Sequence, residues 1–387
     1  MTKVIVAVKD LKKVLKTFST FQDQSQVTQS AVTLSVKPEF KLSIQNDYLL
    51  SEAKIPATIV ESGDDFTMTP ELLMDLSISG APMAELSWKD AKSPLNLVCG
   101  KLTTSLRVAT TKPNVPTDFS DPDTLVTIPL GMLATMTNCL RVPYAYYKAK
   151  RDKAPFWLRV NKQTGCLEAM ADDSYSLAKI ETTLAVNNPE FEVKIPFFIM
   201  DTLFGKIGRD DEGLVTLGSK GYTLLLTNGE VVVKTQGLNE NSVDFDSVFK
   251  EQKEWYPSCD FVPSVLHESV KSVCSIIPTK DKSGVYIRAN FAMPGDKAPS
   301  LSLSVSHADV GEANYQDIDG ISNMYIEKGV NSFIANMHPQ AFLEYTNLLE
   351  TDMARMICNR GAVYYESSFQ QKSGNYKIRY LFPTVAT

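Results

Sequence analysis

The stretch GCLEAMADDSYSLAK, from Gly165 to Lys179, places two adjacent carboxylates, Asp172 and Asp173, in a small polar turn between two apolar runs. Neighbouring residues on a strand or a helix point in different directions, so an adjacent acidic pair is a poor two-carboxylate catalytic site. The role of this turn therefore has to be inferred from the segments around it.

The chain is too long for one ordinary hydrophobic core. Its 387 residues predict two or three domains, and a composition of 43% hydrophobic and 22% charged residues is typical of a folded, soluble protein. No apolar run approaches the length of a membrane span, so no membrane partner is expected. The start MTKVIVAVKDLKK becomes charged too early for a signal peptide. We therefore expect a first strand here and a cytoplasmic protein.

Catalytic and metal-binding patterns are scarce. The six cysteines are scattered without a CxxC pair, which favours reduced core thiols. The sequence has three histidines, too few for most metal and acid–base sites. The sequence has no P-loop, GxSxG or HExxH motif. The acidic pairs at 64–65, 172–173 and 210–211 are expected to be solvated turns. We predict that the chain is not an enzyme and uses no metal or cofactor.

A helix with a basic face recurs along the chain. Its first copy has an apolar stripe at i, i+3, i+4 and i+7, formed by Leu11, Val14, Leu15 and Phe18. Similar spacing follows Pro129 and Pro263, and proline suits the first turn of a helix because its missing N–H is not needed there.

A second kind of helix is predicted from Thr69, Ile195 and Met337, each with proline in its first turn, at Pro70, Pro196 and Pro339. Each is followed by a polar break and then by alternating segments rich in β-branched and aromatic residues, which predict strands. The order strand, helix, strands, helix, strands thus occurs three times, with a period of roughly 120 to 140 residues, the size of one domain. We predict an α+β fold of three similar domains, 1–122, 123–254 and 255–387.

Four segments, in order and at this length, resemble the bacterial-type DNA sliding clamp, the β subunit of the replicative DNA polymerase. LEAMADDSYSLAKIET (Leu167 to Thr182) resembles the family's ATDGxRLA turn, and KIRYLFPTVAT (Lys377 to Thr387) its C-terminal YLxMPM. LNLVCGKLTTSLRVATTKPNVPTDF (from Leu95) resembles the end of its first domain, and VKIPFFIMDTLFGKI (from Val193) its second-domain helix. The resemblance implies a ring-forming fold of three clamp-type domains, each with two helices packed on antiparallel sheets.

In that family the acidic turn is not catalytic but helps to wall a hydrophobic pocket between the second and third domains, where peptides of the polymerase and clamp loader dock. The resemblance implies one wall from Asp172, Ser174, Tyr175, Ser176 and Leu177. It implies another wall from Tyr380, Phe382, Pro383 and Thr384. An apolar groove with a polar rim is what a peptide anchored by an apolar side chain needs.

The chain departs from the family pattern in this region. The family usually has arginine where this chain has Ser176 and glycine where it has Ser174, and the tail continues past Pro383 as Thr-Val-Ala-Thr. These changes alter the shape and charge of the expected pocket. They fit a divergent clamp, such as one encoded by a phage or mobile element.

The resemblance also implies that duplex DNA passes through the ring and meets basic helices without base recognition, so that the ring slides. A net charge of −6 discourages tight binding over the whole surface but allows such a basic channel. The implied channel residues are Lys9, Lys12, Lys13, Lys16, Arg141, Lys206, Arg209 and Lys271.

The densest basic and aromatic stretch is YAYYKAKRDK, from Tyr144 to Lys153. Aromatic rings beside cations suit stacking on exposed bases together with phosphate contact, and in the family the matching loop reaches DNA leaving the ring. A solvated loop with buried tyrosines is the alternative. The implied DNA contacts are Tyr146, Tyr147, Lys148, Lys150, Arg151 and Lys153.

Ring closure in the family joins two chains head to tail by pairing an edge strand of the first domain with one of the third. Such pairing satisfies edge N–H and C=O groups. The candidates here are Leu102, Leu106 and Val108 on the first side and Ile276 and Ile277 on the other. The same residues could instead be ordinary core positions.

The expected function is a processivity factor: a homodimeric ring that encircles double-stranded DNA and tethers a DNA polymerase, with a clamp loader as a further partner. Two alternatives stay open at this point. One is a ring-forming phage structural or assembly protein without a DNA-sliding role, and the other is a clamp relative that no longer encircles DNA.

Overall fold

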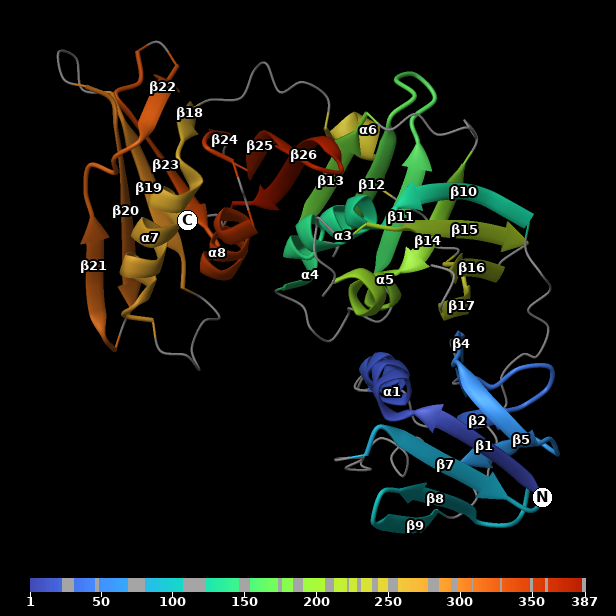
Figure 1. The fold of residues 1–387 in the computed structure, drawn as a ribbon. Coiled ribbons are helices and arrows are strands. Elements are labelled where there is room, and N and C mark those ends of the chain that lie inside the picture. Colours follow the sequence, from blue (N-terminus) through green and yellow to red (C-terminus); the bar gives the residue numbers. More distant parts are fainter. Residues whose placement is uncertain are drawn as a thin grey trace. The chain divides into compact units, whose positions relative to one another are not determined.

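The computed structural model describes residues 1–22, 31–45, 49–68, 81–106, 123–145, 154–172, 176–183, 191–205, 212–220, 223–227, 231–238, 243–249, 257–277, 285–293, 298–307, 309–327, 329–348, 351–358 and 361–384. The chain forms two compact units (Figure 1). Unit 1 contains Met1–Leu130, Thr202–Lys206 and Asp211–Leu238, and unit 2 contains Gly131–Asp201, Ile207–Asp210 and Asn239–Thr387. Every strand pair in the described residues is antiparallel.

Unit 1 holds a five-stranded sheet in the order β5-β1-β7-β8-β9. The first strand alternates buried and half-buried residues, as expected for a sheet with one face on a core. In sheet order, the strands are Ala57–Glu61, Thr2–Ala7, Met83–Trp88, Leu95–Cys99 and Leu102–Leu106.

The second sheet of unit 1 has eight strands in the order β10-β15-β16-β17-β4-β3-β2-β6. It crosses the predicted boundary at residue 122, because β17 pairs with β4 from Val231↔Ala53 to Thr235↔Leu49. In sheet order, the strands are Asp123–Pro129, Leu214–Lys220, Thr223–Thr227, Val231–Gln236, Leu49–Lys54, Lys41–Gln45, Ala31–Ser35 and Phe66–Met68.

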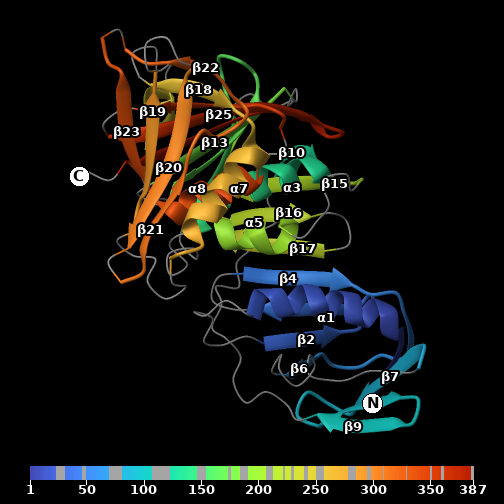
Figure 2. The same cartoon turned by 90° about the vertical axis from the view of Figure 1, so that its left-hand side faces the viewer.

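Helix α1 (Val8–Gln22) follows directly from β1. Its first N–H group, on Val8, donates to the carbonyl of Pro82 at 3.0 Å, which satisfies one of the donors that a helix start leaves open. The predicted apolar stripe of Leu11, Val14, Leu15 and Phe18 is buried. The amphipathic helix predicted here is confirmed, and Figure 2 shows it lying along the strands of unit 1.

Unit 2 is built on a nine-stranded sheet in the order β14-β11-β12-β13-β26-β25-β24-β18-β22. The central pairing, β13 with β26, joins the stretch around the acidic turn to the last described strand of the chain. This sheet crosses the predicted boundary at residue 254. In sheet order, the strands are Glu192–Pro196, Pro155–Val160, Leu167–Asp172, Leu177–Thr182, Gly374–Pro383, Ala362–Gln371, Ala354–Cys358, Ser258–Phe261 and Ile321–Tyr325.

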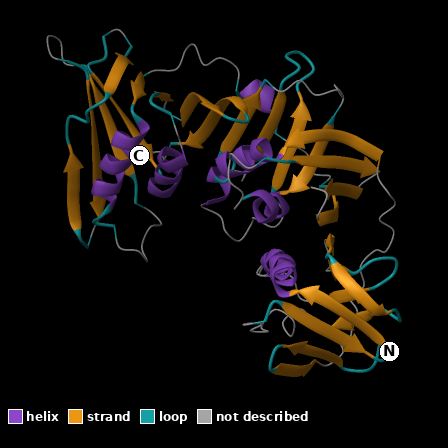
Figure 3. Ribbon diagram, in the orientation of Figure 1, coloured by secondary structure: helices purple, strands orange, loops and turns teal. Residues whose placement is uncertain are grey.

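A four-stranded sheet, β21-β20-β19-β23, completes unit 2. Its strands are Gly311–Tyr315, Ser300–His307, Ile287–Ala292 and Ser332–Met337. The helices of this part of the chain, purple in Figure 3, are α3 (Leu130–Cys139), α4 (Val142–Ala145), α5 (Phe197–Phe204), α6 (Phe245–Val248), α7 (Pro263–Cys274) and α8 (Pro339–Leu348). None of the described helices is long and apolar enough to cross a membrane.

The helices predicted from Ile195 and Met337 start later, at Phe197 and Pro339, because Ile195 and Met337 belong to the preceding strands β14 and β23. Pro263 is the first residue of α7 and Pro339 of α8, whereas Pro129 and Pro196 end the strands that lead into α3 and α5. Thr346 of α8 lies 3.0 Å from Nδ1 of His267, and this contact joins α8 to α7. The helix predicted from Thr69 lies outside the described residues. The three-domain division stays a prediction.

Aromatic side chains fill the core between the nine-stranded sheet and α8. Tyr345 of α8 is fully buried, with its ring centroid 4.2 Å from that of Tyr365 and 4.6 Å from that of Tyr380. The hydroxyl of Tyr380 donates to the carbonyl of Cys139 at 2.6 Å, whereas the buried hydroxyl of Tyr345 has no partner among the described residues. The sheet thus holds α3 through a hydrogen bond and α8 through ring packing.

The two tyrosines make a matched pair for measuring that hydrogen bond. Tyr380→Phe removes the donor to a buried carbonyl and should lower the free energy of unfolding by about 1–2 kcal/mol. Tyr345→Phe removes a hydroxyl that has no partner in the described structure, so it should be neutral or stabilising. Urea midpoints of both variants, followed by near-ultraviolet circular dichroism, measure the difference. Equal midpoints would contradict this account of the two hydroxyls.

Candidate partner-binding site

The acidic turn connects two paired strands of the nine-stranded sheet. Asp172 ends β12 and Leu177 begins β13, and the two are partners in the ladder. Leu177 also pairs with Leu381 of β26, and Ala178 pairs with Tyr380. Because paired residues share one face and successive residues alternate, Leu177 and Leu381 lie on one face of the sheet and Tyr380 on the other.

The two walls predicted for the peptide pocket are therefore divided by the sheet. Tyr380 and Phe382 are buried on the helix side, where both rings pack against Tyr345. Leu177 lies on the opposite face, which we call the outer face, together with Leu381. The structure brings Leu177 together with Leu381 and does not bring it together with Tyr380 or Phe382.

Other predicted pocket residues lie near the ends of these strands. Ser176 is buried just before β13. Pro383 is the exposed last residue of β26, and the N–H of Thr384 donates to the carbonyl of Gly361 at 3.0 Å. Ser174 and Tyr175 lie outside the described residues.

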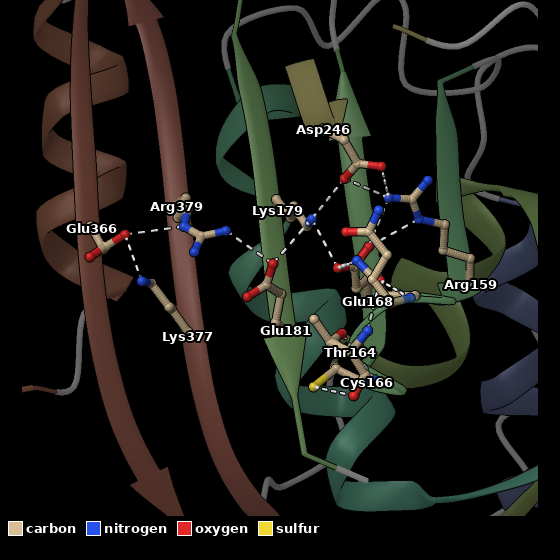
Figure 4. A network of polar contacts seen from close by, with 12 residues as sticks. Arg159, Thr164, Cys166, Glu168, Lys179, Glu181, Asp246, Glu366, Lys377 and Arg379 are labelled. Carbon is tan, nitrogen blue, oxygen red and sulfur yellow. Dashed lines mark hydrogen bonds and ion pairs between the residues drawn. The ribbon is translucent and has the colours of Figure 1, made fainter. Parts of the chain in front are cut away.

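The outer face carries a row of alternating charges across β11, β12, β13, β26 and β25, extended by α6 (Figure 4). We call these residues the charged row: Arg159, Glu168, Lys179, Glu181, Asp246, Glu366, Lys377 and Arg379. Each cation contacts at least one carboxylate, so the row is a continuous chain of ion pairs.

The centre of the row is buried. The side chains of Glu168 and Lys179 are 1% and 4% exposed, and Lys179 Nζ lies 2.9 Å from Glu168 and 3.1 Å from Glu181. Arg159 reaches the second oxygen of Glu168 at 2.9 Å. Burial alone would lower the pKa of Lys179, but the hydrogen bond and the charge of Glu168 outweigh it and raise the pKa. Lys179 is therefore a permanent cation in the folded state.

The other half of the row joins β13 to β26 and β25. Arg379 lies 3.0 Å from Glu181 and 3.1 Å from Glu366, and Lys377 lies 2.9 Å from Glu366. Burial would raise the pKa of Glu366, but its hydrogen bonds to Lys377, Tyr364 and Arg379, together with the charge of Lys377, lower it. These side chains reinforce the backbone pairing of the strands.

Beside the charged row lies an aromatic cluster formed by Trp157, Met170, Phe245, Phe249 and Tyr364. Leu177, Ile357 and Leu381 pack against it. The rings of Trp157 and Phe245 meet edge to face with centroids 5.8 Å apart, and Phe249 packs on Tyr364 at 6.2 Å. Two of the five members, Phe245 and Phe249, belong to α6 or its C-cap, so α6 covers the apolar part of the outer face.

Helix α6 is held by its polar residues as well. Asp244 caps it by accepting from the N–H of Ser247 at 3.1 Å. Asp246 accepts two hydrogen bonds from Arg159, at 2.8 and 2.7 Å, and lies 3.2 Å from Lys179. Burial would raise the pKa of Asp246, but the hydrogen bond from Arg159 and the charges of Lys179 and Arg159 lower it. A lowered carboxyl pKa means that this attachment is complete at neutral pH and is lost only in acid, as the pH falls through the lowered pKa of Asp246.

The residues predicted to contact DNA have mixed surroundings. On α1, Lys9, Lys12, Lys13 and Lys16 are all exposed. Arg141 is ion-paired with Asp201 at 2.5 Å, and Lys271 is exposed on α7 within 3.7 Å of Glu268. The remaining predicted contacts lie outside the described residues: Tyr146, Tyr147, Lys148, Lys150, Arg151, Lys153, Lys206 and Arg209.

Two of the predicted dimer residues are exposed or half-buried. Leu102 is exposed on β9, which is an edge strand, and Ile276 is half-buried in the turn after α7. Leu106 and Ile277 are buried, and Val108 lies outside the described residues.

Sequence reasoning missed the charged row and α6. A four-residue helix shows no periodicity, although Asp244 followed by two phenylalanines four residues apart was a usable signal of a capped apolar turn. No group of three or more histidine, cysteine or acidic side chains in the described residues could hold a metal ion.

Neither a protein-family model nor a curated protein matches the chain. Solved structures do match. The DNA polymerase III β subunit of Thermotoga maritima has a TM-score of 0.80 and 13% identity, with 100% of both chains covered. The putative β subunit of Eubacterium rectale has a TM-score of 0.79 and 12% identity, covering 100% of this chain and 99% of that one. The DnaN sliding clamp of Bartonella birtlesii, bound to griselimycin, has a TM-score of 0.79 and 14% identity over both full chains.

The chain has the sliding-clamp fold. The likeness spans the whole chain, so the predicted α+β class and the resemblance to a divergent bacterial-type clamp are confirmed at the level of fold. The identities of 12 to 14% explain why sequence models did not detect it.

The charged row predicts that losing an ion pair lowers the free energy of unfolding far more at its buried centre than at its half-exposed end. Glu168→Gln removes a buried carboxylate that serves both Arg159 and Lys179, and should lower the free energy of unfolding by about 3 kcal/mol. Lys377→Ala at the half-exposed end should cost below about 1 kcal/mol. Urea denaturation of the two variants at neutral pH makes the comparison, and a cost for Lys377→Ala equal to that for Glu168→Gln would contradict it.

Proposed function

We propose that this chain is a DNA polymerase processivity factor: a homodimeric ring that encircles duplex DNA, slides without sequence specificity and tethers a replicative polymerase. The observation that carries the proposal is the likeness to sliding clamps over the full length of the chain. In this role the chain catalyses no reaction. A clamp loader would be a further partner, and the site of action would be the cell interior.

The basic face of α1 supports the DNA-binding part of the proposal. Lys9, Lys12, Lys13 and Lys16 project from a helix whose other side is fixed in the core. Flexible lysines on a rigid helix contact phosphates without reading bases, which suits a ring that must move along DNA. Arg141 is ion-paired with Asp201, so we expect its contact with phosphate to be weakened.

Edge strands support the ring-closing part of the proposal. β9 and β21 are edge strands of their sheets and could pair between two copies of the chain. Exposed Leu102 on β9 would then become buried at the junction. In this arrangement Leu106, Ile276 and Ile277 would back the pairing strands.

The ring proposal predicts a dimer retained topologically on DNA. Light scattering should give twice the chain mass of 42.9 kDa, and the dimer assembled on DNA by a loader should remain on circular DNA and leave linearised DNA through its ends. A dimer without retention in the absence of a loader would require repeating the test with one. A monomer mass would contradict the ring proposal. Large polymers whose retention is the same on circular and linearised DNA would contradict it as well.

The α1 lysines predict a second, quantitative result. Replacing Lys9, Lys12, Lys13 and Lys16 with alanine should weaken DNA binding and reduce the slope of log K against log salt by up to about 3.6 for each chain of the ring, because each phosphate contact contributes about 0.9. Lys271→Ala serves as a single-charge comparison. The mass of the dimer should be unchanged. An unchanged salt slope would show that the α1 lysines do not contact DNA.

A further inference from the structure

One edge of the five-stranded sheet in unit 1 takes no part in the proposed ring closure. The sheet runs β5-β1-β7-β8-β9, so pairing of two copies through β9 leaves β5 at the opposite edge (Figure 1). β5 pairs with β1 from Val6↔Ala57 to Lys3↔Glu61, and with no other strand of the described residues. The other side of β5 therefore presents backbone N–H and C=O groups that a further strand could pair with.

The residues of β5 give this edge little protection against pairing. Proteins usually guard an edge strand with charged residues or proline. β14, an edge of the nine-stranded sheet, follows that rule with Glu192, Lys194 and Pro196. β5 instead reads Ala-Thr-Ile-Val before Glu61, and Val60 is 51% exposed. An uncharged edge of mostly β-branched residues is well suited to accept another strand.

A cavity of about 580 Å³ opens beside β5. Ala57 and Ile59 of β5 line it, together with Val14 of α1, so the cavity lies on the side of the sheet that α1 covers. Phe40 and Ile55, which also line it, are buried and make its floor apolar. The other lining residues are Asp10, Lys13, Pro38, Glu39, Lys54, Pro56 and Val231. An apolar floor with a few charged groups at its border is typical of a binding cavity.

The position of the cavity fits a side chain of an added strand. Residues that pair across two strands point to the same face of the sheet. Ile59 pairs with Val4, which is buried in the core under α1. A residue that pairs with Ile59 on the free side of β5 would therefore direct its side chain toward α1 and into the cavity. One edge thus offers both backbone pairing and a place for an apolar anchor.

The end of β5 favours a positively charged partner. Glu61, Asp64 and Asp65 are all exposed, and none of them forms an ion pair with a described residue. At the start of the strand, Lys54 is ion-paired with Glu39 at 2.7 Å. A lysine or arginine of a partner would therefore be attracted to the end of β5 rather than to its start.

We propose that β5 accepts an extended segment of a partner protein as an added antiparallel strand. One apolar side chain of the segment enters the cavity between β5 and α1. A basic side chain that precedes it contacts the acidic end of β5, formed by Glu61, Asp64 and Asp65, because an antiparallel segment begins beside Glu61. The inference goes beyond the proposed function, since it requires neither ring closure nor DNA.

The test uses the full-length chain and the fluorescent peptide Lys-Thr-Arg-Thr-Leu-Thr-Val-Thr, whose basic residues precede a leucine anchor. Fluorescence anisotropy should show binding to the unaltered chain. Ala57→Phe fills the cavity from β5 and should weaken binding at least about tenfold, because the leucine is no longer buried. A peptide with aspartate in place of leucine should bind as weakly. Absence of binding to the unaltered chain would overturn the β5 site.

A charge exchange tests the acidic end at exposed positions. The triple variant Glu61→Lys, Asp64→Lys, Asp65→Lys should bind the basic peptide about tenfold more weakly, and should bind a peptide with glutamate in place of both basic residues. Glu192→Lys, on the edge strand β14, is the matched control and should leave both affinities unchanged. If Ala57→Phe does not fold, as judged by circular dichroism, the charge exchange carries the test. A folded triple variant with the peptide preference of the unaltered chain would contradict the proposal.

Hydrogen–deuterium exchange distinguishes strand addition from a looser attachment. Binding of the basic peptide should slow exchange of the amides of Ala57–Glu61, because an added strand protects them, and should leave those of β14 unchanged. Binding without protection in β5 would overturn strand addition.

Retention on circular DNA keeps this proposal apart from the proposed function. A chain that is retained on circles but does not bind the peptide would contradict the β5 site and leave the clamp intact. Peptide binding by a chain that is not retained in the presence of a loader would support the β5 site and contradict the clamp.

Discussion

The pairing of β13 with β26 is the constraint on which the structure of unit 2 depends. It joins Leu177–Thr182 to Gly374–Pro383, across almost two hundred residues of chain, in the middle of a nine-stranded sheet. Its register places Leu177 beside Leu381 and Lys179 beside Arg379. That single choice decides which side chains meet α8 and which form the outer face.

The charged row gives this register its specificity. Alternating residues of a strand change faces when the pairing slips by one residue. If β13 slipped in this way, Lys179 would turn toward the tyrosine core around Tyr345 and away from Glu168 of the neighbouring strand. Buried ion pairs add little net stability, but a register that leaves a buried cation without a carboxylate partner is strongly disfavoured. The row therefore acts mainly against wrong pairings.

This dependence on register explains how much the sequence could predict. The helices α1, α3, α5, α7 and α8 and most strands follow from periodicity and proline placement, which are local signals. Tyr380 and Phe382 were grouped with Leu177 because the resemblance to the sliding-clamp family implies that the acidic turn and the last strand wall one pocket. Only the register assigns them to opposite faces, and register between segments this far apart is not a local property. Lys179 and Glu168 were overlooked because lysine and glutamate are ordinarily exposed.

The same alternation separates two tasks within one sheet. On the helix side, Tyr380 fixes α3 by a hydrogen bond and α8 by ring packing, so those residues cannot change without disturbing the helices. On the outer face, the neighbouring residue Arg379 contacts the charged row and Leu381 packs against the aromatic cluster. The sheet thus separates the residues that position the helices from the residues of the outer face.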